Sequence, residues 1–377
     1  MSSVVTFDSQ PPEGTINFGI GQPSADLLPL QLVKQASERF FKDALPIELN
    51  YGVIEGDARF LESLAEYLSH DYGVEADPDE LVVTSGCSQG LSMSSFMFAR
   101  PGDTVIVEEP CYFLAYQIFH DHGLNIVSVP MDEEGMNVDA LRHELESVKP
   151  AFLYTISSYH NPTGQCTSEA RRRQLVEIAA EHDFLIVADE VYQLLNYNGS
   201  PPPAYGTMTG SDRVVSLGSF SKILAPGIRL GWVQTSPRLR QHLLNAGYIN
   251  SGGSLNHFAS HIVRQAINDG SLRAHVKHLR RAYGSRLQAM DDALNEHFAG
   301  IAEWDRPGGG YFVWVRFDPD LDTTPLRQKA PELEAGFQHG AVFSMRGIQK
   351  NCIRLCFAHY GEEDIAEGIA RIRPLFD

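Results

Sequence analysis

The sequence predicts an α/β protein with a large, mostly parallel sheet and a second, smaller α+β domain. From about residue 46 to residue 235, short apolar runs rich in β-branched residues alternate with segments of helical period, which is typical of a parallel sheet covered by helices. The chain has 377 residues, and this is more than a single compact core usually holds. We therefore expect two tightly associated domains with a cleft between them.

Four runs in this region predict buried strands, because each is short, apolar and followed by polar or glycine-containing residues. They cover residues 81–84, 104–107, 152–156 and 184–188. In sheets of this kind, ligands bind just beyond the carboxyl ends of the strands. The residues that follow each run are therefore the first candidates for a functional site.

The last third of the chain predicts a different organisation. Apolar residues at helical spacing over 275–298 predict a long helix that links the two domains. Strand-like runs at 311–317 and 352–357 and a final amphipathic stretch follow it. We divide the chain into an N-terminal segment (1–44) that contributes to the small domain and the active-site entrance, a large domain (45–272) and a small C-terminal domain (273–377).

Composition disfavours several classes of function. The formal net charge of −18 repels phosphate backbones, so we expect no nucleic-acid partner. The five cysteines form no Cys-x-x-Cys pair, so we expect no metal and reduced thiols in a cytoplasmic protein. The first ten residues are polar and mixed, and no apolar run has membrane length, so we expect no membrane partner.

The loop around Lys222 gathers groups that can hold a phosphate and a carbonyl compound together. Ser219 and Ser221 precede the lysine, and Arg229 follows it by seven positions. Partial desolvation or nearby cations lower the pKa of a lysine and free its amine as a nucleophile. The alternative is a solvated surface lysine in a turn rich in serine and glycine.

Asp189 follows the run 184–188 directly, and Tyr192 lies on the next turn. At the carboxyl end of a strand, the carboxylate of Asp189 is expected to face the cleft. A buried carboxylate needs a cation, and the protonated pyridine nitrogen of a cofactor would supply one while acting as an electron sink. The alternative is that Asp189 caps a following helix.

Two more loops follow predicted strands. Asn161 begins an Asn-Pro-Thr-Gly turn after the run 152–156 and could donate its amide to a phenolate oxygen, unless the segment is only an ordinary turn. Gly86, Cys87 and Ser88 join a strand to a predicted helix. The free amides and the dipole of such a helix can receive a phosphate, although a connection without a ligand has the same composition.

Tyr112 and Arg354 complete the set of candidates. Tyr112 follows the run 104–107 and could stack on a flat cofactor, or it could pack in the core. Arg354 lies within the run 352–357, on the strand face opposite to Ile353 and Leu355. Its guanidinium could bind a substrate carboxylate with two hydrogen bonds, or it could form a surface ion pair.

Taken in order, these motifs resemble the fold-type I enzymes of pyridoxal 5′-phosphate (PLP), specifically the class I and II aminotransferases, over nearly the whole chain. The segment 218–232, Gly-Ser-Phe-Ser-Lys-Ile-Leu-Ala-Pro-Gly-Ile-Arg-Leu-Gly-Trp, is similar to that of the α-aminoadipate and kynurenine aminotransferases and of the catalytic domain of MocR-type regulators. The resemblance implies a fold-type I architecture with a seven-stranded large sheet, and PLP as the cofactor.

The resemblance also implies roles for single residues. Lys222 would be the Schiff-base lysine and proton shuttle, and Asp189 the partner of the pyridine nitrogen. The other implied roles are phenolic-oxygen donor for Asn161 and Tyr192, ring stacking for Tyr112, the phosphate site for Gly86, Cys87, Ser88, Ser219, Ser221 and Arg229, and substrate binding for Gly21, Asn161 and Arg354. Tyr51 resembles the tyrosine that reaches the phosphate of a neighbouring subunit, which implies a homodimer with shared active sites.

The implied reaction moves an amino group between an L-amino acid and a 2-oxo acid through the Schiff base on Lys222. The same fold hosts PLP-dependent lyases, decarboxylases and oxidases, so these reactions are alternatives. A ligand-sensing domain like that of MocR proteins is a further one, which the acidic charge and the short segment before Gly21 disfavour.

Two departures from the family pattern concern the substrate pocket. The segment 343–347 replaces a Pro-Gly and a longer stretch before the carboxylate-binding arginine. The segment 11–32 holds no arginine that could receive a second substrate carboxylate. The amino donor and acceptor therefore stay open.

Overall fold

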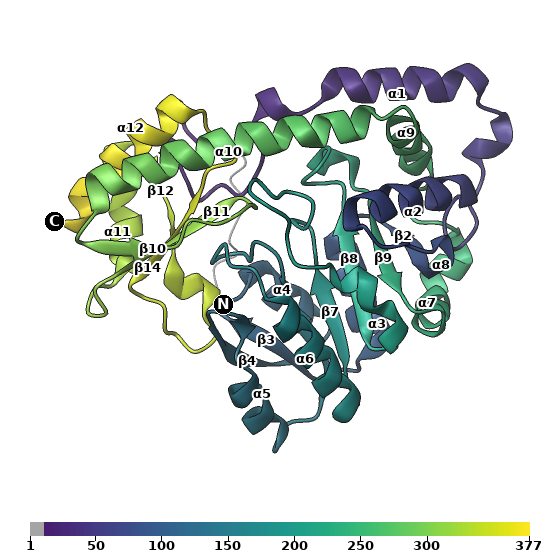
Figure 1. The fold of residues 1–377 in the computed structure, drawn as a ribbon, viewed down its shortest axis with the longest axis horizontal. Helices are drawn as coiled ribbons and strands as arrows, with labels where there is room; N and C mark the ends of the chain where they lie inside the picture. The colour runs from purple at the N-terminus through teal and green to yellow at the C-terminus, as the bar shows by residue number, and fades with distance from the viewer. Residues whose placement is uncertain (1–10) are drawn as a thin grey trace.

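The computed structural model describes residues 11–377. A large sheet with its covering helices forms one part, and a smaller sheet with α11 and α12 forms the other (Figure 1). The long helix α10 (Ser271–Phe298) extends from one part to the other along one side of the molecule (Figure 1). This is the two-part architecture that the sequence predicts.

The large sheet has the strand order β2-β9-β8-β7-β6-β3-β4-β5. Its strands are β2 (Leu81–Thr84), β3 (Thr104–Glu109), β4 (Asn125–Asp132), β5 (Gly135–Met136), β6 (Pro150–Thr155), β7 (Leu185–Asp189), β8 (Val214–Ser219) and β9 (Gly231–Thr235). Strands β4, β3, β6, β7 and β8 pair in parallel, whereas β9 is antiparallel to both of its neighbours. The mostly parallel fold is confirmed.

The number of strands differs from the seven that the family resemblance implies. The eighth strand, β5, has only two residues and pairs antiparallel with the end of β4. Gly135 has a φ of 124°, a conformation that few other residues adopt, and it lets the chain reverse there. The extra strand is therefore a short hairpin at the sheet edge rather than a further layer.

The helices of the larger part pack on the sheet or on one another through apolar faces. They are α2 (Ala58–Tyr72), α3 (Cys87–Phe98), α4 (Phe113–Asp121), α5 (Val138–Leu145), α6 (Glu169–Glu181), α7 (Pro237–Leu244), α8 (Gly247–Gly252) and α9 (His257–Asn268). Helix α2 shows how local chemistry sets the bounds. The Asp57 carboxylate accepts from the Phe60 amide at its start, and Gly73 ends it at a φ of 68°.

The smaller sheet has the order β10-β11-β14-β13. Its strands are β10 (Ala302–Trp304), β11 (Phe312–Phe317), β13 (Gln338–His339) and β14 (Cys352–Cys356), and its helices are α11 (Thr323–Lys329) and α12 (Glu362–Ile372). All five residues of β14 are buried, so Arg354 faces the protein interior rather than solvent. The strand therefore has no solvent-exposed face.

The N-terminal segment spans both parts of the molecule. Strand β1 (Ile16–Asn17) pairs in parallel with β12 (Ala335–Gly336) near the smaller sheet, whereas α1 (Leu30–Asp43) lies beside α9 of the larger part. The first ten residues of the segment 1–44 lie outside the described residues. The domain boundaries at 44/45 and 272/273 stay a prediction.

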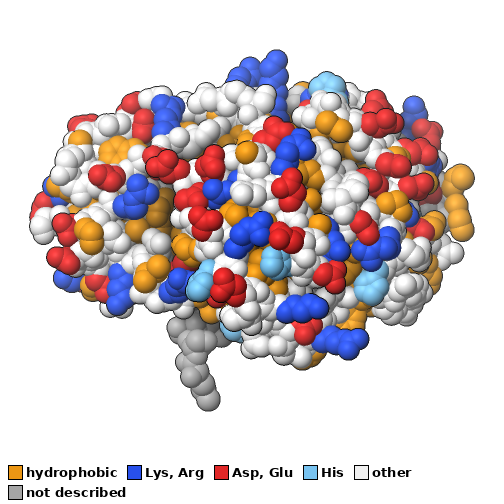
Figure 2. Space-filling view, turned by 60° about the horizontal axis from the view of Figure 1, so that its bottom comes forward, with side chains coloured by type: hydrophobic (Ala, Val, Ile, Leu, Met, Phe, Trp, Pro, Cys, Tyr) orange, Lys and Arg blue, Asp and Glu red, His pale blue; other side chains and the backbone are white. Residues whose placement is uncertain are grey.

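The distribution of surface charge and the apolar character of the helices concern possible binding partners. On the face in Figure 2, acidic and basic side chains are intermixed and the basic ones form no continuous area. None of the helices within residues 11–377 combines the length and apolar character that crossing a membrane requires.

Candidate active site

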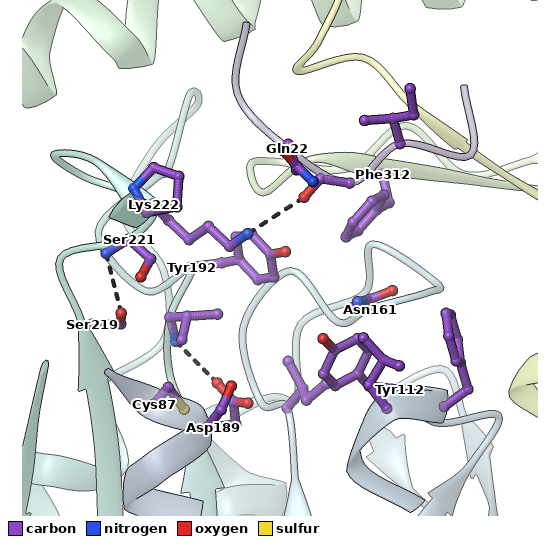
Figure 3. A pocket seen from close by; sticks show the side chains of 18 of the residues that line it. Gln22, Cys87, Tyr112, Asn161, Asp189, Tyr192, Ser219, Ser221, Lys222 and Phe312 are labelled. Atoms are coloured by element: carbon purple, nitrogen blue, oxygen red, sulfur yellow. Dashed lines mark hydrogen bonds between the residues drawn. The ribbon is translucent and has the colours of Figure 1, made fainter. Parts of the chain in front are cut away.

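A cavity of about 560 Å³ lies where the carboxyl ends of β6, β7 and β8 face the smaller part (Figure 3). Of the predicted site residues it is lined by Gly21, Cys87, Ser88, Tyr112, Asn161, Asp189, Tyr192, Ser219, Ser221, Lys222, Arg229 and Arg354. Gly86 and Tyr51 do not line it. The cavity lies at the sheet edge where loops gather binding groups in this architecture.

Lys222 follows β8 and points into this cavity (Figure 3). Its Nζ atom lies 3.4 Å from the Gly21 carbonyl oxygen, and 5.8 Å and 5.2 Å from the ring centroids of Tyr192 and Tyr311. Burial, assisted by the guanidinium groups of Arg354 and Arg229, lowers the pKa of Lys222 to about 8. The alternative of a solvated surface lysine is therefore wrong.

Asp189 ends β7 and is 7% exposed. The Tyr154 hydroxyl donates to its Oδ2 atom over 2.9 Å, and the Val191 amide donates to Oδ1 over 3.4 Å. No helix begins after Asp189, because the chain continues through turns; the helix-cap alternative is therefore wrong. Burial raises the pKa of this carboxyl, and none of residues 11–377 forms an ion pair with it, so the site lacks a cation there.

The residues that are predicted to bind the cofactor phosphate surround one corner of the cavity. The Ser221 amide donates to Ser219 Oγ over 3.1 Å, and Arg229 Nη1 lies 3.4 Å from Ser221 Oγ. Helix α3 begins at Cys87 without a side-chain cap, so its first amides are free for an anion. Gly86 does not touch the cavity, but a Cβ there would lie 2.9 Å from Arg229 Nη2. The lack of a side chain at Gly86 therefore leaves room for the Arg229 guanidinium.

Asn161 and Arg354 meet across the two parts of the molecule. Arg354 Nη1 donates to Asn161 Oδ1 over 2.9 Å and Nη2 donates to the Gly19 carbonyl over 2.9 Å. The guanidinium is buried, lies 4.1 Å from the Phe312 ring centroid and has an Nε atom without a hydrogen bond. Among the described residues it has no carboxylate partner. The surface ion pair alternative is wrong, and the guanidinium is available for a substrate anion.

A buried contact between Glu108 and His160 supports the turn that carries Asn161. Glu108, which is fully buried, lies 3.1 Å from His160 Nε2, and His160 Nδ1 lies 2.9 Å from Thr163 Oγ1. With its Oδ1 atom bonded to Arg354, the Asn161 amide nitrogen is left to donate toward the cavity. The predicted donor role of Asn161 requires this free nitrogen, and the role itself stays a prediction.

The tyrosines separate into two groups. Tyr192 and Tyr112 line the cavity, and burial raises the pKa of both hydroxyls, so each keeps its proton and can donate. Tyr112 also packs at the edge of a core cluster. Tyr51 is 83% exposed and lies away from the cavity of its own chain, so one chain alone does not bring it to the site.

Several lining residues carried no signal in the sequence. They include Asn17, Gln22, Phe312, Arg327 and Gln338, with Tyr154 just behind Asp189. Tyr154 lies within a predicted strand, where alternation alone says nothing about its hydroxyl. The rest come from segments that reach the cavity only through tertiary packing.

The residues present fit PLP. A buried carboxylate without a cation suits the pyridinium nitrogen, and the serines, free helix amides and Arg229 suit a phosphate. The amine of Lys222 lies in the same cavity as both. These three features are what a phosphorylated pyridine aldehyde requires.

The family match decides the identity of the chain. The model for aminotransferase class I and II matches residues 13–372. The chain belongs to the class I and II aminotransferases. As a member of this family it is an enzyme that transfers amino groups with PLP as its cofactor.

Relatives of this aminotransferase include both enzymes and regulators. The aromatic-amino-acid aminotransferase 1 of Thermococcus litoralis is 33% identical over 362 residues, which are 95% of this chain and 87% of that protein. Less similar relatives include HTH-type transcriptional regulators, such as YisV of Bacillus subtilis at 26% identity.

Solved structures of aminotransferases share the fold. The kynurenine aminotransferase of Pyrococcus horikoshii, in complex with PMP, has a TM-score of 0.90 and 30% identity, and the match covers 97% of this chain and 91% of that one. The α-aminoadipate aminotransferase LysN of Thermus thermophilus, in complex with N-(5′-phosphopyridoxyl)-L-leucine, has a TM-score of 0.87 and 30% identity, over 97% and 92% of the two chains.

Proposed function

We propose that in this aminotransferase Lys222 carries the proton between donor and cofactor, while Asp189, Asn161 and Arg354 hold the reacting groups. The observation that carries the proposal is the arrangement of one cavity. A lysine amine with a lowered pKa, a buried carboxylate without a cation and a buried guanidinium without a carboxylate all face it. Each of these groups is matched by one part of PLP or of an amino acid.

The residues of the chain divide the work. Bound PLP supplies the electron sink that makes the Cα proton of an amino acid acidic. Lys222, with a pKa of about 8, has roughly a tenth of its amine free near pH 7 and takes the proton at Nζ. Asp189 holds the positive pyridine nitrogen, and Arg354 binds the α-carboxylate and thereby orients the donor.

An absorption experiment tests the assignment of Lys222. Purified wild-type enzyme is expected to show a visible cofactor band that an amino acid removes, with release of a 2-oxo acid. Lys222→Ala should lose the band, and Lys329→Ala, at an exposed lysine outside the cavity, should keep it. A normal half-reaction in Lys222→Ala would contradict the assignment. A wild-type band without oxo-acid release would favour a lyase, decarboxylase, oxidase or ligand-sensing activity.

We also propose a homodimer in which Tyr51 reaches the phosphate site of the partner subunit. Support comes from apolar side chains exposed on one stretch of the surface, since monomers rarely expose many together. They are Phe41, Leu45, Ile47, Leu49, Tyr51 and Val53, with Phe258 against Phe41.

Light scattering with size-exclusion chromatography tests the dimer. Leu49→Asp should produce monomers, whereas Ile301→Asp, at an exposed apolar residue elsewhere, should not. Tyr51→Phe should leave the dimer intact and weaken the binding of PLP several-fold. A monomeric wild type would exclude the shared site.

We further propose that the enzyme works in the cytoplasm. The support is that the five cysteines are all free thiols, as a reducing compartment requires.

A further inference from the structure

The charges that line the cavity do not balance. Among residues 11–377, four cationic side chains face it, Lys222, Arg229, Arg327 and Arg354, against the single carboxylate of Asp189. The proposed function gives partners to three of the four: the cofactor phosphate for Arg229, the substrate α-carboxylate for Arg354, and the reaction itself for Lys222. Arg327 is left without a role.

Arg327 lies on α11 and lines the same cavity as Arg354. Its Nε atom donates to Gln338 Oε1 over 3.1 Å. Gln338 is 7% exposed and is the direct neighbour of Arg354 in the β13–β14 pair, so these two side chains lie on the same face of the sheet. Gln338 therefore connects Arg327 to the strand position of Arg354.

No described residue neutralises this guanidinium. Within residues 11–377, the hydrogen bond to Gln338 is its single polar contact, and it forms no ion pair. His339, beside Gln338, does not compete for an anion, because burial and the charge of Arg327 lower its pKa to about 4 and keep it neutral. The two terminal nitrogens of Arg327 are free to bind a carboxylate.

The surroundings of Arg327 suit the same kind of ligand. Gln338 uses its oxygen for Arg327, which leaves its amide nitrogen as a donor. Asn17 accepts from the Gly19 amide through Oδ1 over 2.9 Å, which likewise leaves its nitrogen free, and Gln22 lines the cavity as well. The described residues on this side of the cavity present donors and include no acidic group.

We propose that Arg327, supported by Gln338, binds a second carboxylate, namely the one that ends the side chain of a dicarboxylic amino acid or of its 2-oxo acid. The inference rests on the proposed function, because it assigns Arg354 to the α-carboxylate. It places the specificity residue on α11 of the smaller part, whereas the described N-terminal stretch, residues 11–32, contains no arginine. Arg327 is exposed to solvent. When a neutral substrate is bound, water can therefore solvate its guanidinium.

Ligand binding tests the proposal without turnover. Calorimetric titration of the PLP-loaded enzyme would compare glutarate with pentanoate and adipate with hexanoate, pairs that differ by one terminal carboxylate. Wild type should bind the better-fitting diacid at least about tenfold more tightly than its monoacid, as a charge-assisted bidentate contact predicts. Arg327→Gln should abolish this ratio, and Lys329→Gln, on the same helix but outside the cavity, should keep it.

Steady-state kinetics separate failure of this inference from failure of the proposed function. Arg327→Gln should lower the ratio of kcat/KM for dicarboxylic donors to kcat/KM for alanine about tenfold. A wild type that reacts with alanine but binds diacids no better than monoacids, or an unchanged ratio in Arg327→Gln, would overturn the role of Arg327 alone. A wild type without a cofactor band would overturn the proposed function and this inference with it.

Discussion

Tyr154 determines the environment of the carboxylate that faces the cofactor. Its hydroxyl donates to Asp189 Oδ2 over 2.9 Å inside the core. Hydrogen bonds to charged groups contribute about 1.5–3 kcal/mol, so Tyr154→Phe should weaken PLP binding and slow the half-reaction roughly tenfold, since the ionised carboxylate is less stabilised. Equilibrium titration with PLP and stopped-flow absorbance measure both effects. Tyr205→Phe is the control, because the buried Tyr205 hydroxyl has no hydrogen-bond partner within residues 11–377. Equal effects in the two variants would contradict the role of Tyr154.

Lys222 should destabilise the cofactor-free chain. Its pKa falls from 10.5 to about 8 on folding, so between these values the unfolded chain binds more protons and stability rises with pH. Below pH 8 both states are protonated and the folded state bears the full cost, on the order of 1–3 kcal/mol. Lys222→Met should therefore unfold later than wild type in urea at pH 7, with a gain that shrinks above pH 8. A gain that does not depend on pH would indicate a packing effect instead.

Among the secondary-structure elements, the antiparallel pair of strands β8 and β9 depends on a glycine. Gly218 faces Trp232 directly in this pair, and a Cβ at position 218 would overlap the indole ring. Gly218→Ala should lower the free energy of unfolding by about 1–3 kcal/mol or more, because the buried ring must leave its rotamer. It should also displace the loop of Ser219 to Lys222. Gly227→Ala, where a Cβ meets nothing within 4 Å, is the control in denaturant titrations, and equal losses would contradict the steric argument.

Over the whole molecule, partly buried histidines should make folding sensitive to acid. Burial lowers the pKa of His275 and of His339 to about 4. Between pH 6.5 and 4 the unfolded chain takes up protons that the folded chain does not, so stability is present above pH 6.5 and is lost as pH falls toward 4. The slope of unfolding free energy against pH in this window should flatten in His275→Asn and His339→Asn. It should not change in His143→Asn, whose side chain is 81% exposed.

Local signals in the sequence were sufficient for much of the fold and the site. The apolar runs predicted β2, β3, β6 and β7 to within about two residues at each end, because a buried parallel strand must be apolar on both faces. The loops with Asp189, Asn161 and Lys222 could be found because they follow those strands directly. Two of the alternatives, a helix cap for Asp189 and a surface lysine at position 222, could be excluded only from the structure.

The sequence by itself determined the parallel sheet, the family and the groups of the cavity that lie in strand-end loops, since these depend on residues close together in the chain. Only the tertiary structure decided that Tyr154 supports Asp189, that Arg354 meets Asn161 and that Arg327 faces the same cavity. Each of these contacts joins segments separated by tens to hundreds of residues. Nothing in a local pattern specifies the partner of a polar side chain, because that partner depends on how the two sheets and their helices pack around the cavity.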